Sequence, residues 1–412
     1  MTETVYAVLL HDEHIGSIQR RDDFTRFVFD RGYWDRPDRA VLGRWFEDHP
    51  WFEDHPRKQQ HAVNRVPVWF SNLLPEGRLR DLIAREQGVN IYREVDLLER
   101  IGGDLPGAVC VIPDPDRQVD APFDDVVPAS TPISSTTAAG PHRASLAGMT
   151  LKFSMSRRGD RLVVPARGRD GDWILKTPDR SYPDLPANEL AVMRLAGSVG
   201  IDVPEARLWS RDDIDDLGPG AWTSEETRAY AVRRFDRSPG GRIHIEDFAQ
   251  VLGRFGAGEG KYRSTVETVA AIAYRGRDRA SLREMVRRSV FNLLVGNGDA
   301  HLKNWSLIYP DRRVARLSPA YDLVCTAAYP NHADLGLPFF GATRLSEISR
   351  GHFARLQAAL KVEGDDVLDV VDGTIERFSE TWAAGAAERL PASVATWIEE
   401  HLERIRRQLA QE

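Results

Sequence analysis

The 412-residue sequence contains only two cysteines, Cys110 and Cys325. Two cysteines cannot provide a disulfide framework, and a chain with so few suits a reducing compartment. Because the two residues do not form a CxxC pair, the sequence also argues against a structural zinc site. Cysteine chemistry is therefore not expected to organise this protein.

Long hydrophobic runs are missing as well. No stretch reaches the roughly 18 consecutive apolar residues that a membrane-spanning helix needs. The opening residues, MTETVYAVLLHDEHIGSIQR, carry neither the basic segment nor the long apolar segment of a signal peptide. We therefore expect a cytoplasmic protein with no membrane contact.

Positive charge is in deficit, with 55 lysines and arginines against 62 aspartates and glutamates and a net charge of −7. Such a chain is not expected to grip nucleic acid over a broad surface, although a local basic patch is compatible with this composition. Hydrophobic residues make up 42% and charged residues 28%, which is typical of a globular protein with an apolar core. The length suits two or three domains, at about 100–200 residues each.

Residues 113–142, PDPDRQVDAPFDDVVPASTPISSTTAAGPH, are rich in proline, aspartate, serine and threonine. A segment of this composition buries little surface, so we interpret it as a linker and place the main domain boundary there. Periodicity and turn residues predict the elements on either side. Before the linker they are a strand at 4–10, a turn at His14-Ile15-Gly16, a strand at 24–29, and helices at 76–87 and 94–101. After it they are a strand at 173–176, a helix at 188–199, a strand at 228–235, a mainly helical region from 245 onward, and a helix at 392–409.

Residues 45–56 repeat a six-residue unit in WFEDHPWFEDHP. Two copies are too few for a solenoid. The prolines and acidic residues favour an exposed loop, and we interpret the repeat as a local duplication without a function of its own.

The segment GNGDAHLKNWSLIY at residues 296–309 concentrates polar side chains just before an apolar run. Phosphoryl transfer needs a carboxylate near the attacking hydroxyl and oxygen ligands for magnesium. Protein kinases supply both from an Asp-x-x-x-x-Asn loop, and Asp299 and Asn304 have that spacing. A second metal-binding aspartate is expected nearby, and Asp322 lies in the apolar run LSPAYDLVCT. A hairpin predicted between residues 305–309 and 314–317 would return Asp322 beside Asn304.

Other interpretations of these residues stay open at this point. Asp299 by itself can cap a helix or a turn, and Asp322 by itself can be a satisfied polar residue in a core. The combination at this spacing favours the catalytic interpretation. His301 suggests a metal site through its Asp-x-His pattern, but no second histidine lies nearby at ligand spacing. We therefore expect His301 to orient the loop or to contact phosphate.

A kinase also needs a cation for the phosphate groups. Lys176 ends the predicted strand WILK, and Glu189 in the following helix is its expected partner. A lysine at a strand end can equally be solvated. Upstream, RASLAGMTLKFSM at residues 143–155 places Gly148 among small residues, where backbone N–H groups are able to approach phosphate. The segment is neither a Walker A nor a GxGxxG sequence, so a plain β-turn is the alternative.

Together these segments resemble the HipA-like serine/threonine kinase family, the toxin arm of bacterial type II toxin–antitoxin pairs. The matching stretches, which follow the family's order over nearly the whole chain, are SNLLPEGRLR (71–80), SLAGMTLKFS (145–154), WILKTP (173–178), NEL (188–190), RRFDR (233–237), HIEDFAQVLG (244–253), NGDAHLKNWS (297–306) and SPAYDL (318–323). The resemblance implies an α+β fold, in which an N-terminal α/β subdomain precedes a two-lobed domain similar to protein kinases and phosphatidylinositol kinases. The implied segments are the N-terminal subdomain at 1–112, the linker at 113–142, a kinase N-lobe at 143–237 and a mainly helical C-lobe at 238–412.

The resemblance also implies roles for individual residues. Asp299 becomes the catalytic aspartate, Asn304 and Asp322 the magnesium ligands, and Lys176 the phosphate-binding lysine. The implied phosphate loop is Ala147, Gly148, Met149, Thr150, Leu151 and Lys152, the implied adenine-binding hinge is Arg233, Arg234 and Phe235, and further nucleotide contacts fall on His301, Lys303 and Tyr321. Ser145 matches the serine that family members autophosphorylate. A phosphate there adds nearly two negative charges where the ATP phosphates should sit, which would displace the loop and switch the kinase off.

Two positions depart from the family pattern. Arg233 stands where the family often has glutamate, which changes little if backbone groups hold the adenine. Thr150 replaces a common glutamine in the implied phosphate loop, so the phosphate contacts at this position are expected to differ.

The implied activity is that of an ATP- and Mg²⁺-dependent Ser/Thr protein kinase. Its substrate would be a cytoplasmic protein, such as the glutamyl aminoacyl-tRNA synthetase, whose phosphorylation stops translation and growth. The family also implies a helix-turn-helix antitoxin of the HipB type, which would supply the DNA contacts. Two other functions are open: a small-molecule phosphotransferase, such as an antibiotic kinase, and a non-catalytic kinase-like module that binds a repressor. The N-terminal region argues against the first, and the intact catalytic set argues against the second.

Overall fold

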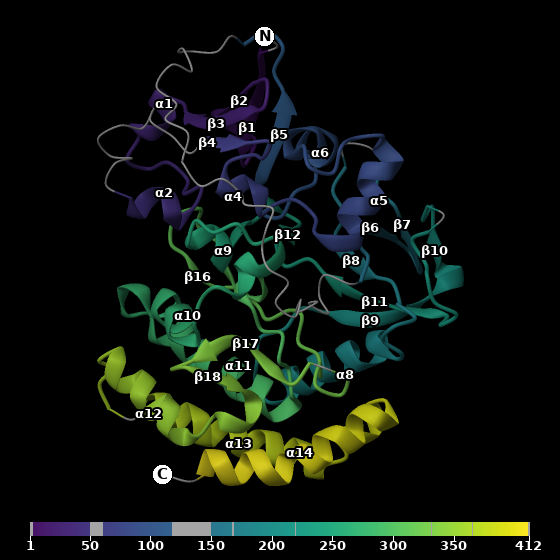
Figure 1. The fold of residues 1–412 in the computed structure, drawn as a ribbon, viewed down its shortest axis with the longest axis vertical. Coiled ribbons are helices and arrows are strands. Elements are labelled where there is room, and N and C mark those ends of the chain that lie inside the picture. The colour runs from purple at the N-terminus through teal and green to yellow at the C-terminus, as the bar shows by residue number, and fades with distance from the viewer. Residues whose placement is uncertain are drawn as a thin grey trace, which may run out of the picture.

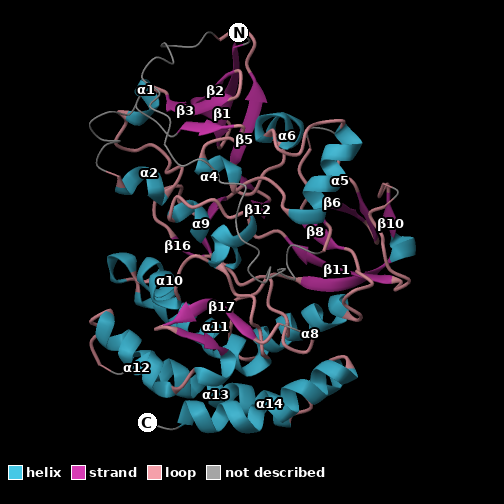
Figure 2. Cartoon of the chain, viewed as in Figure 1, coloured by secondary structure: helices cyan, strands magenta, loops and turns pink. Residues whose placement is uncertain are grey.

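The computed structural model describes residues 3–49, 61–117, 150–166, 169–218, 220–330, 332–364 and 366–410. Three regions follow one another along the long axis in Figure 1: an N-terminal sheet with short helices, a second sheet, and a helical region that contains the last helix. Figure 2 shows the same succession by element type, with the long helices gathered at one end of the molecule.

The N-terminal region is built on an antiparallel sheet with the strand order β4-β3-β2-β1-β5. Its strands are β1 (Glu3–Leu10), β2 (Glu13–Arg21), β3 (Phe24–Phe29), β4 (His61–Val63) and β5 (Val109–Pro113). The strands expected at 4–10 and 24–29 are confirmed, and β2 between them is a strand that the sequence pattern did not predict.

The turn predicted at His14-Ile15-Gly16 is wrong, because these residues lie inside β2. The chain turns earlier, at His11 and Asp12, whose φ angles are 52° and 64°. Two successive residues with positive φ match the twist of a tight hairpin. Gly16 serves a different purpose: a Cβ there would lie 2.3 Å from the Val28 carbonyl oxygen, so the neighbouring strand leaves no room for a side chain.

Short helices and aromatic side chains complete the N-terminal region. The helices are α1 (Arg31–Trp34), α2 (Arg44–Asp48), α4 (Val68–Ser71), α5 (Gly77–Gln87) and α6 (Glu94–Ile101). Helices α5 and α6 confirm the helices predicted at 76–87 and 94–101. Phe27 lies at the centre of the aromatic core, with its ring centroid 4.7 Å from that of Phe29 and 4.8 Å from that of Phe70. Such aromatic packing supplies much of the energy of a small core.

The first copy of the repeat at 45–56 lies partly in α2, so the expected exposed loop is wrong for that copy. Phe46 is 1% exposed and packs edge-on against Phe27 and Phe29. Trp45 stacks on His49 with ring centroids 4.1 Å apart. The free energy gained by burying these aromatic rings outweighs the preference of the acidic residues in the same unit for an exposed loop. The second copy lies outside the described residues.

The second sheet has the strand order β10-β7-β6-β8-β11-β9. Its strands are β6 (Lys152–Arg158), β7 (Arg161–Val163), β8 (Trp173–Lys176), β9 (Ala206–Ser210), β10 (Ile214–Asp215) and β11 (Arg228–Arg233). The strand predicted at 173–176 is confirmed, and the one predicted at 228–235 ends at Arg233. Because side chains alternate along a strand, Trp173 and Leu175 join an apolar cluster on one face, whereas Ile174 and Lys176 line a cavity on the other.

Helices dominate the rest of the chain. Helix α8 (Leu185–Ser198) contacts the second sheet and begins three residues before the helix predicted from residue 188. The others are α9 (Phe248–Val251), α10 (Val266–Ala273), α11 (Arg279–Val295), α12 (Arg350–Ala359), α13 (Asp366–Ala383) and α14 (Ala392–Ala410). Their buried side chains form one apolar core that includes residues of α8. Helix α14 confirms the helix predicted at 392–409.

Short strands and 3-10 helices interrupt the helical region. The strands are β12 (Arg237–Ser238) paired with β13 (Gly241–Arg242), a sheet of β14 (His244–Asp247), β15 (Ser306–Tyr309) and β16 (Arg316–Leu317), and β17 (Asp334–Phe339) paired with β18 (Ala342–Arg344). The 3-10 helices are η2 (Arg211–Asp213), η3 (Gly258–Tyr262), η4 (Arg275–Arg277), η5 (Leu302–Asn304), η6 (Leu345–Glu347) and η7 (Ala386–Arg389). The hairpin predicted between residues 305–309 and 314–317 is confirmed, with Leu307 opposite Leu317.

The structure also bears on the expectations about membrane-spanning helices, cysteines and the linker. Within the described parts of the chain, no helix has the length and apolar character needed to cross a bilayer. Cys110 and Cys325 are both free thiols. The start of the predicted linker packs on the N-terminal sheet, since Asp114 N donates to the Val5 carbonyl at 2.9 Å, and residues 118–149 lie outside the described residues. The division of the chain after residues 112, 142 and 237 stays a prediction.

Candidate active site

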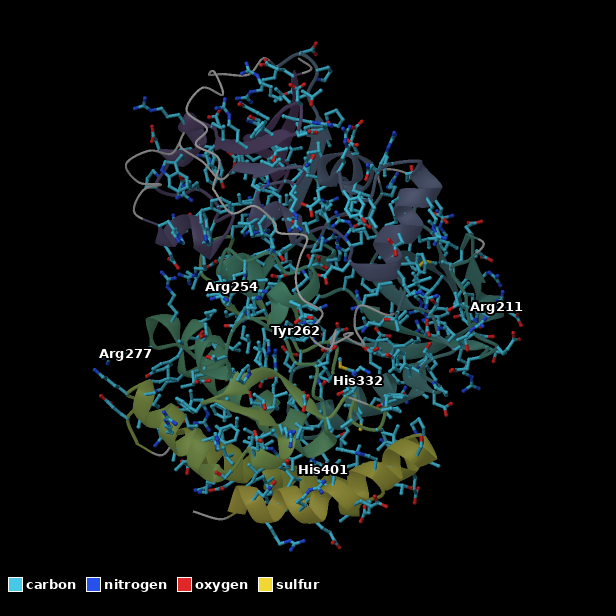
Figure 3. All side chains as sticks on the ribbon, viewed as in Figure 1. Arg211, Arg254, Tyr262, Arg277, His332 and His401 are labelled. Atoms are coloured by element: carbon cyan, nitrogen blue, oxygen red, sulfur yellow. The ribbon has the colours of Figure 1, made fainter. Side chains whose placement is uncertain are left out.

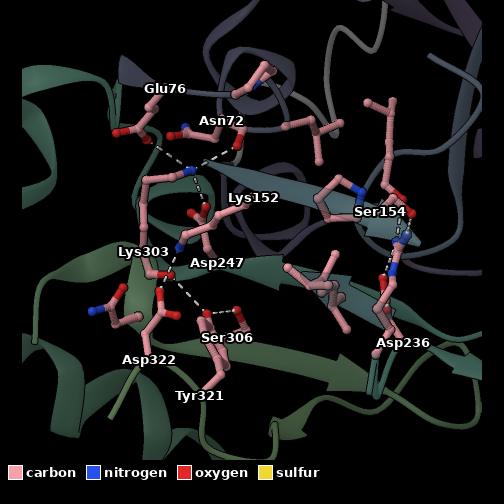
Figure 4. Close-up of a pocket in the computed structure, with 18 of the residues that line it drawn as sticks. Asn72, Glu76, Lys152, Ser154, Asp236, Asp247, Lys303, Ser306, Tyr321 and Asp322 are labelled. Atoms are coloured by element: carbon pink, nitrogen blue, oxygen red, sulfur yellow. Dashed lines mark hydrogen bonds and ion pairs between the residues drawn. The ribbon is translucent and has the colours of Figure 1, made fainter. Parts of the chain in front are cut away.

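A cavity of ≈ 480 Å³ opens where the N-terminal region, the second sheet and the helical region meet. Figure 4 shows lysine and carboxylate side chains gathered at one end of it. The predicted site residues in its lining are Thr150, Lys152, Lys176, Arg233, Arg234, Phe235, His301, Lys303, Asn304, Tyr321 and Asp322. Residues far apart in the sequence are therefore brought to one cavity, and most of the predicted set is among them.

Some predicted residues are placed elsewhere. Leu151 is buried in the protein rather than in the cavity wall, and its carbonyl accepts a hydrogen bond from Thr177 N at 3.2 Å. Asp299 is also not a lining residue, although it bonds to one that is. Ser145, Ala147, Gly148 and Met149 lie outside the described residues.

The loop that carries Asp299 follows helix α11 and is held by side-chain hydrogen bonds. Helix α11 ends at Val295, and Gly296 follows with a φ of 69°. The Asn304 side chain closes the loop, because its Nδ2 donates to the Asp299 carbonyl oxygen at 2.9 Å. Oδ1 of Asp299 accepts a hydrogen bond from the Tyr262 hydroxyl at 2.9 Å. These contacts hold Asp299 next to Asn304, which lines the cavity.

Asp322 is returned to this loop by the β15–β16 hairpin. Its backbone has a φ of 55°, a strained conformation for aspartate. Oδ2 accepts a hydrogen bond from Lys152 Nζ at 3.0 Å, and Oδ1 pairs with Lys176. Burial acts to raise the pKa of Asp322, but the two ammonium groups hold that pKa well below its ordinary range. The carboxylate is therefore ionised near pH 7.

Lys176 links the second sheet to helix α8. Its Nζ lies 2.5 Å from Glu189 Oε1, which confirms the expected pair, and it also contacts Asp322. Burial acts to lower the pKa of Lys176, but the carboxylates of Asp322 and Glu189 outweigh it and raise the pKa. Lys176 is therefore a buried, charged lysine held between two carboxylates.

The predicted hinge leaves β11 toward the N-terminal region. The backbone N–H groups of Arg233 and Arg234 donate to the Glu205 and Asp172 carbonyls at 2.8 Å and 2.9 Å. Arg233 lines the cavity, and its side chain is 52% exposed. Phe235 turns inward, and its ring centroid lies 5.7 Å from that of Tyr321.

Arg234 lines the cavity, and carboxylates hold its side chain in place. Its guanidinium pairs with Asp104 at 2.6 Å and with Asp236 at 2.9 Å. It also donates to the Leu105 carbonyl at 3.1 Å. Burial acts to lower the pKa of Arg234, and the two carboxylates raise it above its ordinary value. The Arg234 side chain therefore connects the hinge to the N-terminal region.

Lys303 and His301 line the cavity from the loop between Asp299 and Asn304. Lys303 Nζ donates to the Asn72 carbonyl at 2.8 Å and to Asp247 Oδ2 at 2.7 Å, and Glu76 Oε1 lies 3.6 Å away, as Figure 4 shows. Burial lowers the pKa of His301 to about 4, so its imidazole is neutral near pH 7. A neutral imidazole suits a role in orienting the loop.

The sequence did not point to the residues that the N-terminal region contributes. Asn72, Glu76 and Asp104 line the cavity. The sequence pattern assigned only helices to this part of the chain, at 76–87 and 94–101, and gave these three residues no role in a site. Asp247 contacts Lys303 and Tyr262 contacts Asp299, although neither belongs to the predicted site. The one available signal was the stretch SNLLPEGRLR, which matched the family but carries no chemical pattern of its own.

The fold and the cavity define a class of protein. A sheet-bearing lobe and a helical lobe enclose a cavity with a lysine–glutamate pair and an Asp-x-x-x-x-Asn loop, which are the parts of a kinase-like fold. The family described as the HipA-like C-terminal domain matches residues 144–382, and the one described as the HipA N-terminal domain matches residues 6–112. The chain belongs to the HipA-like kinase family.

Known proteins resemble the chain over most of its length. Y4dM of Sinorhizobium fredii, a kinase by name, is 39% identical over 408 residues, which cover 97% of this chain and 96% of that protein. The serine/threonine-protein kinase toxin HipA of Shewanella oneidensis is 28% identical over 296 residues, 65% of this chain and 64% of the toxin. A solved Shewanella oneidensis complex of HipA, HipB and operator DNA contains a chain that superimposes with a TM-score of 0.74 at 22% identity, over 98% of this chain and 97% of that one. This match confirms the predicted α+β fold with its kinase-like lobes.

Proposed function

We propose that the chain is an ATP- and Mg²⁺-dependent serine/threonine protein kinase. One observation carries the proposal: Lys176, Asn304 and Asp322 converge on a single cavity beside Asp299. Phosphoryl transfer needs this set, namely a cation for the phosphates, oxygen ligands for a divalent ion, and a carboxylate that meets the hydroxyl. The kinase names of the relatives in Sinorhizobium and Shewanella support the same activity.

The donor set fits magnesium. Proteins bind Mg²⁺ through one or two carboxylate or amide oxygens, and phosphate and water complete its shell. Asp322 offers a carboxylate and Asn304 an amide, and both line the cavity. Nδ2 of Asn304 donates a hydrogen bond to the Asp299 carbonyl oxygen, so Oδ1 is the side-chain atom that would bind the ion. When bound, the ion would neutralise negative charge on the phosphates.

The cavity also fits a purine nucleotide at its apolar end. Phe235 and Tyr321 lie there with Ile174 and Val232, which gives an aromatic and aliphatic surface for a base. Lys152 and Lys176 lie at the charged end, where they would bind phosphate oxygens in exchange for part of their contact with Asp322. We therefore propose that the hinge Arg233, Arg234 and Phe235, the segment Ala147, Gly148, Met149, Thr150, Leu151 and Lys152, and the residues His301, Lys303 and Tyr321 surround the nucleotide.

Asp299 is proposed to act on the substrate. Its carboxylate would accept the hydroxyl proton of a serine or threonine and orient the oxygen toward the transferred phosphoryl group. We propose Ser145 as the site of an inhibitory autophosphorylation, because it matches the serine that family members modify and its phosphate would repel the ATP phosphates by like charge.

The partners follow from the family. The Shewanella HipA chain was solved with HipB and operator DNA, and we propose that this chain likewise binds a small helix-turn-helix antitoxin. A net charge of −7 suits a division in which the antitoxin makes most DNA contacts. We propose a cytoplasmic protein substrate, such as the glutamyl aminoacyl-tRNA synthetase, whose modification would stop translation.

The test compares the purified protein with Asp299→Asn. Each is incubated with γ-labelled MgATP, a bacterial lysate and an aminoglycoside, and the label is located by electrophoresis and mass spectrometry. Asp311→Asn, in the exposed β15–β16 turn, is the matched control. We expect label on serine or threonine residues of protein with the wild type and Asp311→Asn, and none with Asp299→Asn, while all three bind MgATP in calorimetry.

Other outcomes overturn the proposal in distinguishable ways. Label on the aminoglycoside would make the chain a small-molecule phosphotransferase. Absence of MgATP binding by the wild type would make it a non-catalytic kinase-like module. An active Asp299→Asn variant would remove Asp299 from the reaction.

A further inference from the structure

The Tyr262 hydroxyl reaches the carboxylate that we propose as the base. Its Oη donates to Oδ1 of Asp299 at 2.9 Å. Its ring also meets His301 edge-on, with centroids 5.3 Å apart and an angle of 77° between the planes. Tyr262 therefore contacts two members of the catalytic loop from a segment to which the proposed chemistry assigns no role.

Tyr262 ends a glycine-rich segment, FGAGEGKY at residues 255–262, which we name the glycine strap. The last part of the strap is η3. The strap passes so close to the N-terminal region that a Cβ on Gly256 would lie 2.3 Å from Asn72 Oδ1. Figure 3 labels Tyr262 near the middle of the molecule, between the N-terminal region and the helical region.

The N-terminal region holds the glycine strap at both ends. At its start, the Gly256 N–H donates to Asn72 Oδ1 at 2.9 Å. At its end, Lys261 Nζ pairs with Glu76 Oε2 at 3.1 Å, and Lys261 is 5% exposed. Glu76 also lies 3.6 Å from Lys303. One buried and one partly buried anchor therefore hold the strap, and with it the Tyr262 ring, against the N-terminal region.

We propose that Tyr262 is the positioning residue of the Asp299 carboxylate. This rests on the proposed kinase function. A carboxylate with one oxygen held by a fixed donor presents its other oxygen in a defined direction, and a base of this kind needs such a direction to meet a substrate hydroxyl. The N-terminal region thereby takes part in catalysis, because Asn72 and Glu76 hold the strap that holds Tyr262.

The first experiment removes the hydroxyl alone. The initial rate of label transfer from γ-labelled MgATP to protein is measured against ATP concentration for wild type, Tyr262→Phe and Tyr274→Phe. Tyr274 is a half-buried tyrosine at the end of α10 and serves as the matched control. We expect Tyr262→Phe to lower the maximal rate by about tenfold or more, because small misplacements of a reacting group have effects of this size. The KM for ATP and the affinity for MgADP should stay within about twofold of wild type, as with Tyr274→Phe.

The second experiment tests the route through the glycine strap. Lys261→Met removes the anchor to Glu76, and it is measured alone and together with Tyr262→Phe. If Lys261 acts through Tyr262, the double variant should be no slower than Tyr262→Phe alone, whereas independent effects would multiply. Multiplying effects would overturn the coupling between the N-terminal region and Tyr262.

The outcomes separate this inference from the kinase proposal. If the wild type transfers no label, the kinase proposal fails. If the wild type is active, Asp299→Asn is inactive and Tyr262→Phe matches the wild type, the kinase proposal stands and the role of Tyr262 is wrong. A faster Tyr262→Phe variant would also overturn it, since the hydroxyl would then compete with the substrate for Asp299.

Discussion

Arg234 of the hinge and Asp104 of the N-terminal region form an ion pair with 2.6 Å between Nη1 and Oδ1. The same Asp104 oxygen accepts from Arg237 at 3.0 Å, and its other oxygen accepts from the Ser154 hydroxyl at 2.5 Å. One carboxylate thus joins the N-terminal region to β6 and to the segment after β11. Two parts of the chain that the sequence pattern separates are held together at the edge of the cavity.

Loss of the Asp104 charge should loosen this junction. Asp104→Asn leaves Arg234 and Arg237 with one carboxylate fewer, and we expect the free energy of unfolding to fall by about 2 kcal/mol, a typical value for hydrogen bonds to charged groups. Differential scanning calorimetry and urea unfolding measure the change. Asp38→Asn, at an exposed position, is the control and should leave both transitions unchanged. An Asp104→Asn protein as stable as this control would show that the junction contributes nothing.

Replacement of Lys176 should disable the phosphate end of the cavity. Lys176→Met leaves Glu189 and Asp322 without their shared ammonium group, and we expect the rate of phosphate transfer to fall by about a hundredfold or more, as for other buried charge-stabilising donors. Steady-state rates with labelled MgATP measure the loss. The control, Lys361→Met at an exposed position, should retain full activity. Retained activity in Lys176→Met would exclude this lysine from phosphate binding.

Glu246 should make the stability of the chain depend on pH. Burial raises its pKa to about 7 from an ordinary 4.5, although Tyr309, Arg44 N and Trp69 donate hydrogen bonds to it. The folded state therefore holds this proton more tightly than the unfolded state does. Its contribution to stability is fully present below pH 4.5 and is lost as the pH rises through 7, with a total of about 3 kcal/mol.

The measurement compares unfolding of the wild type and Glu246→Gln at pH 5 and at pH 8. We expect a neutral glutamine to remove most of the loss between these pH values. Glu225→Gln, which changes an exposed carboxylate, controls for the effect of net charge. Parallel pH curves for the wild type and Glu246→Gln would contradict the prediction.

The two cysteines should differ in reactivity. Burial raises the pKa of Cys325 to about 12, and Cys325 is buried in the helical core. Cys110 is half-buried in β5 and contacts Arg242. Iodoacetamide at pH 8 should label Cys110 in the native protein and Cys325 only after denaturation, with mass spectrometry locating the adduct. Labelling of Cys325 in the native chain at the rate of Cys110 would contradict its burial.

The predictable part of the site was its local part. Asp299 and Asn304 lie in one loop, and a hairpin returns Asp322 to them, so spacing along the chain was enough to group them. The pairing of Lys176 with Glu189 was predicted because a helix that carries Glu189 follows the strand that ends at Lys176. Signals of this kind depend on periodicity within short windows, which a sequence shows directly.

The unpredicted part depends on contacts between distant segments. Asn72 and Lys303 are joined by a hydrogen bond at 2.8 Å across more than half of the chain, and no periodic pattern records such a pair. Arg234 was assigned to the hinge, but the sequence of two adjacent arginines does not indicate which one pairs with Asp104. Gly16 was predicted to lie in a turn, but it lies in a strand where the neighbouring strand leaves no room for a side chain. The sequence alone does not distinguish these two uses of glycine.

The N-terminal region supplies Leu79, Ile83 and Ile101 to the cavity wall, together with the anchors of Lys303. A shortened gene product that began after this region would therefore keep every residue of the Asp-x-x-x-x-Asn loop and still lack one side of the chamber in which that loop works. Truncation at the start of the chain would therefore also remove part of the cavity wall. Natural variants that lack the N-terminal region should lack the activity as well.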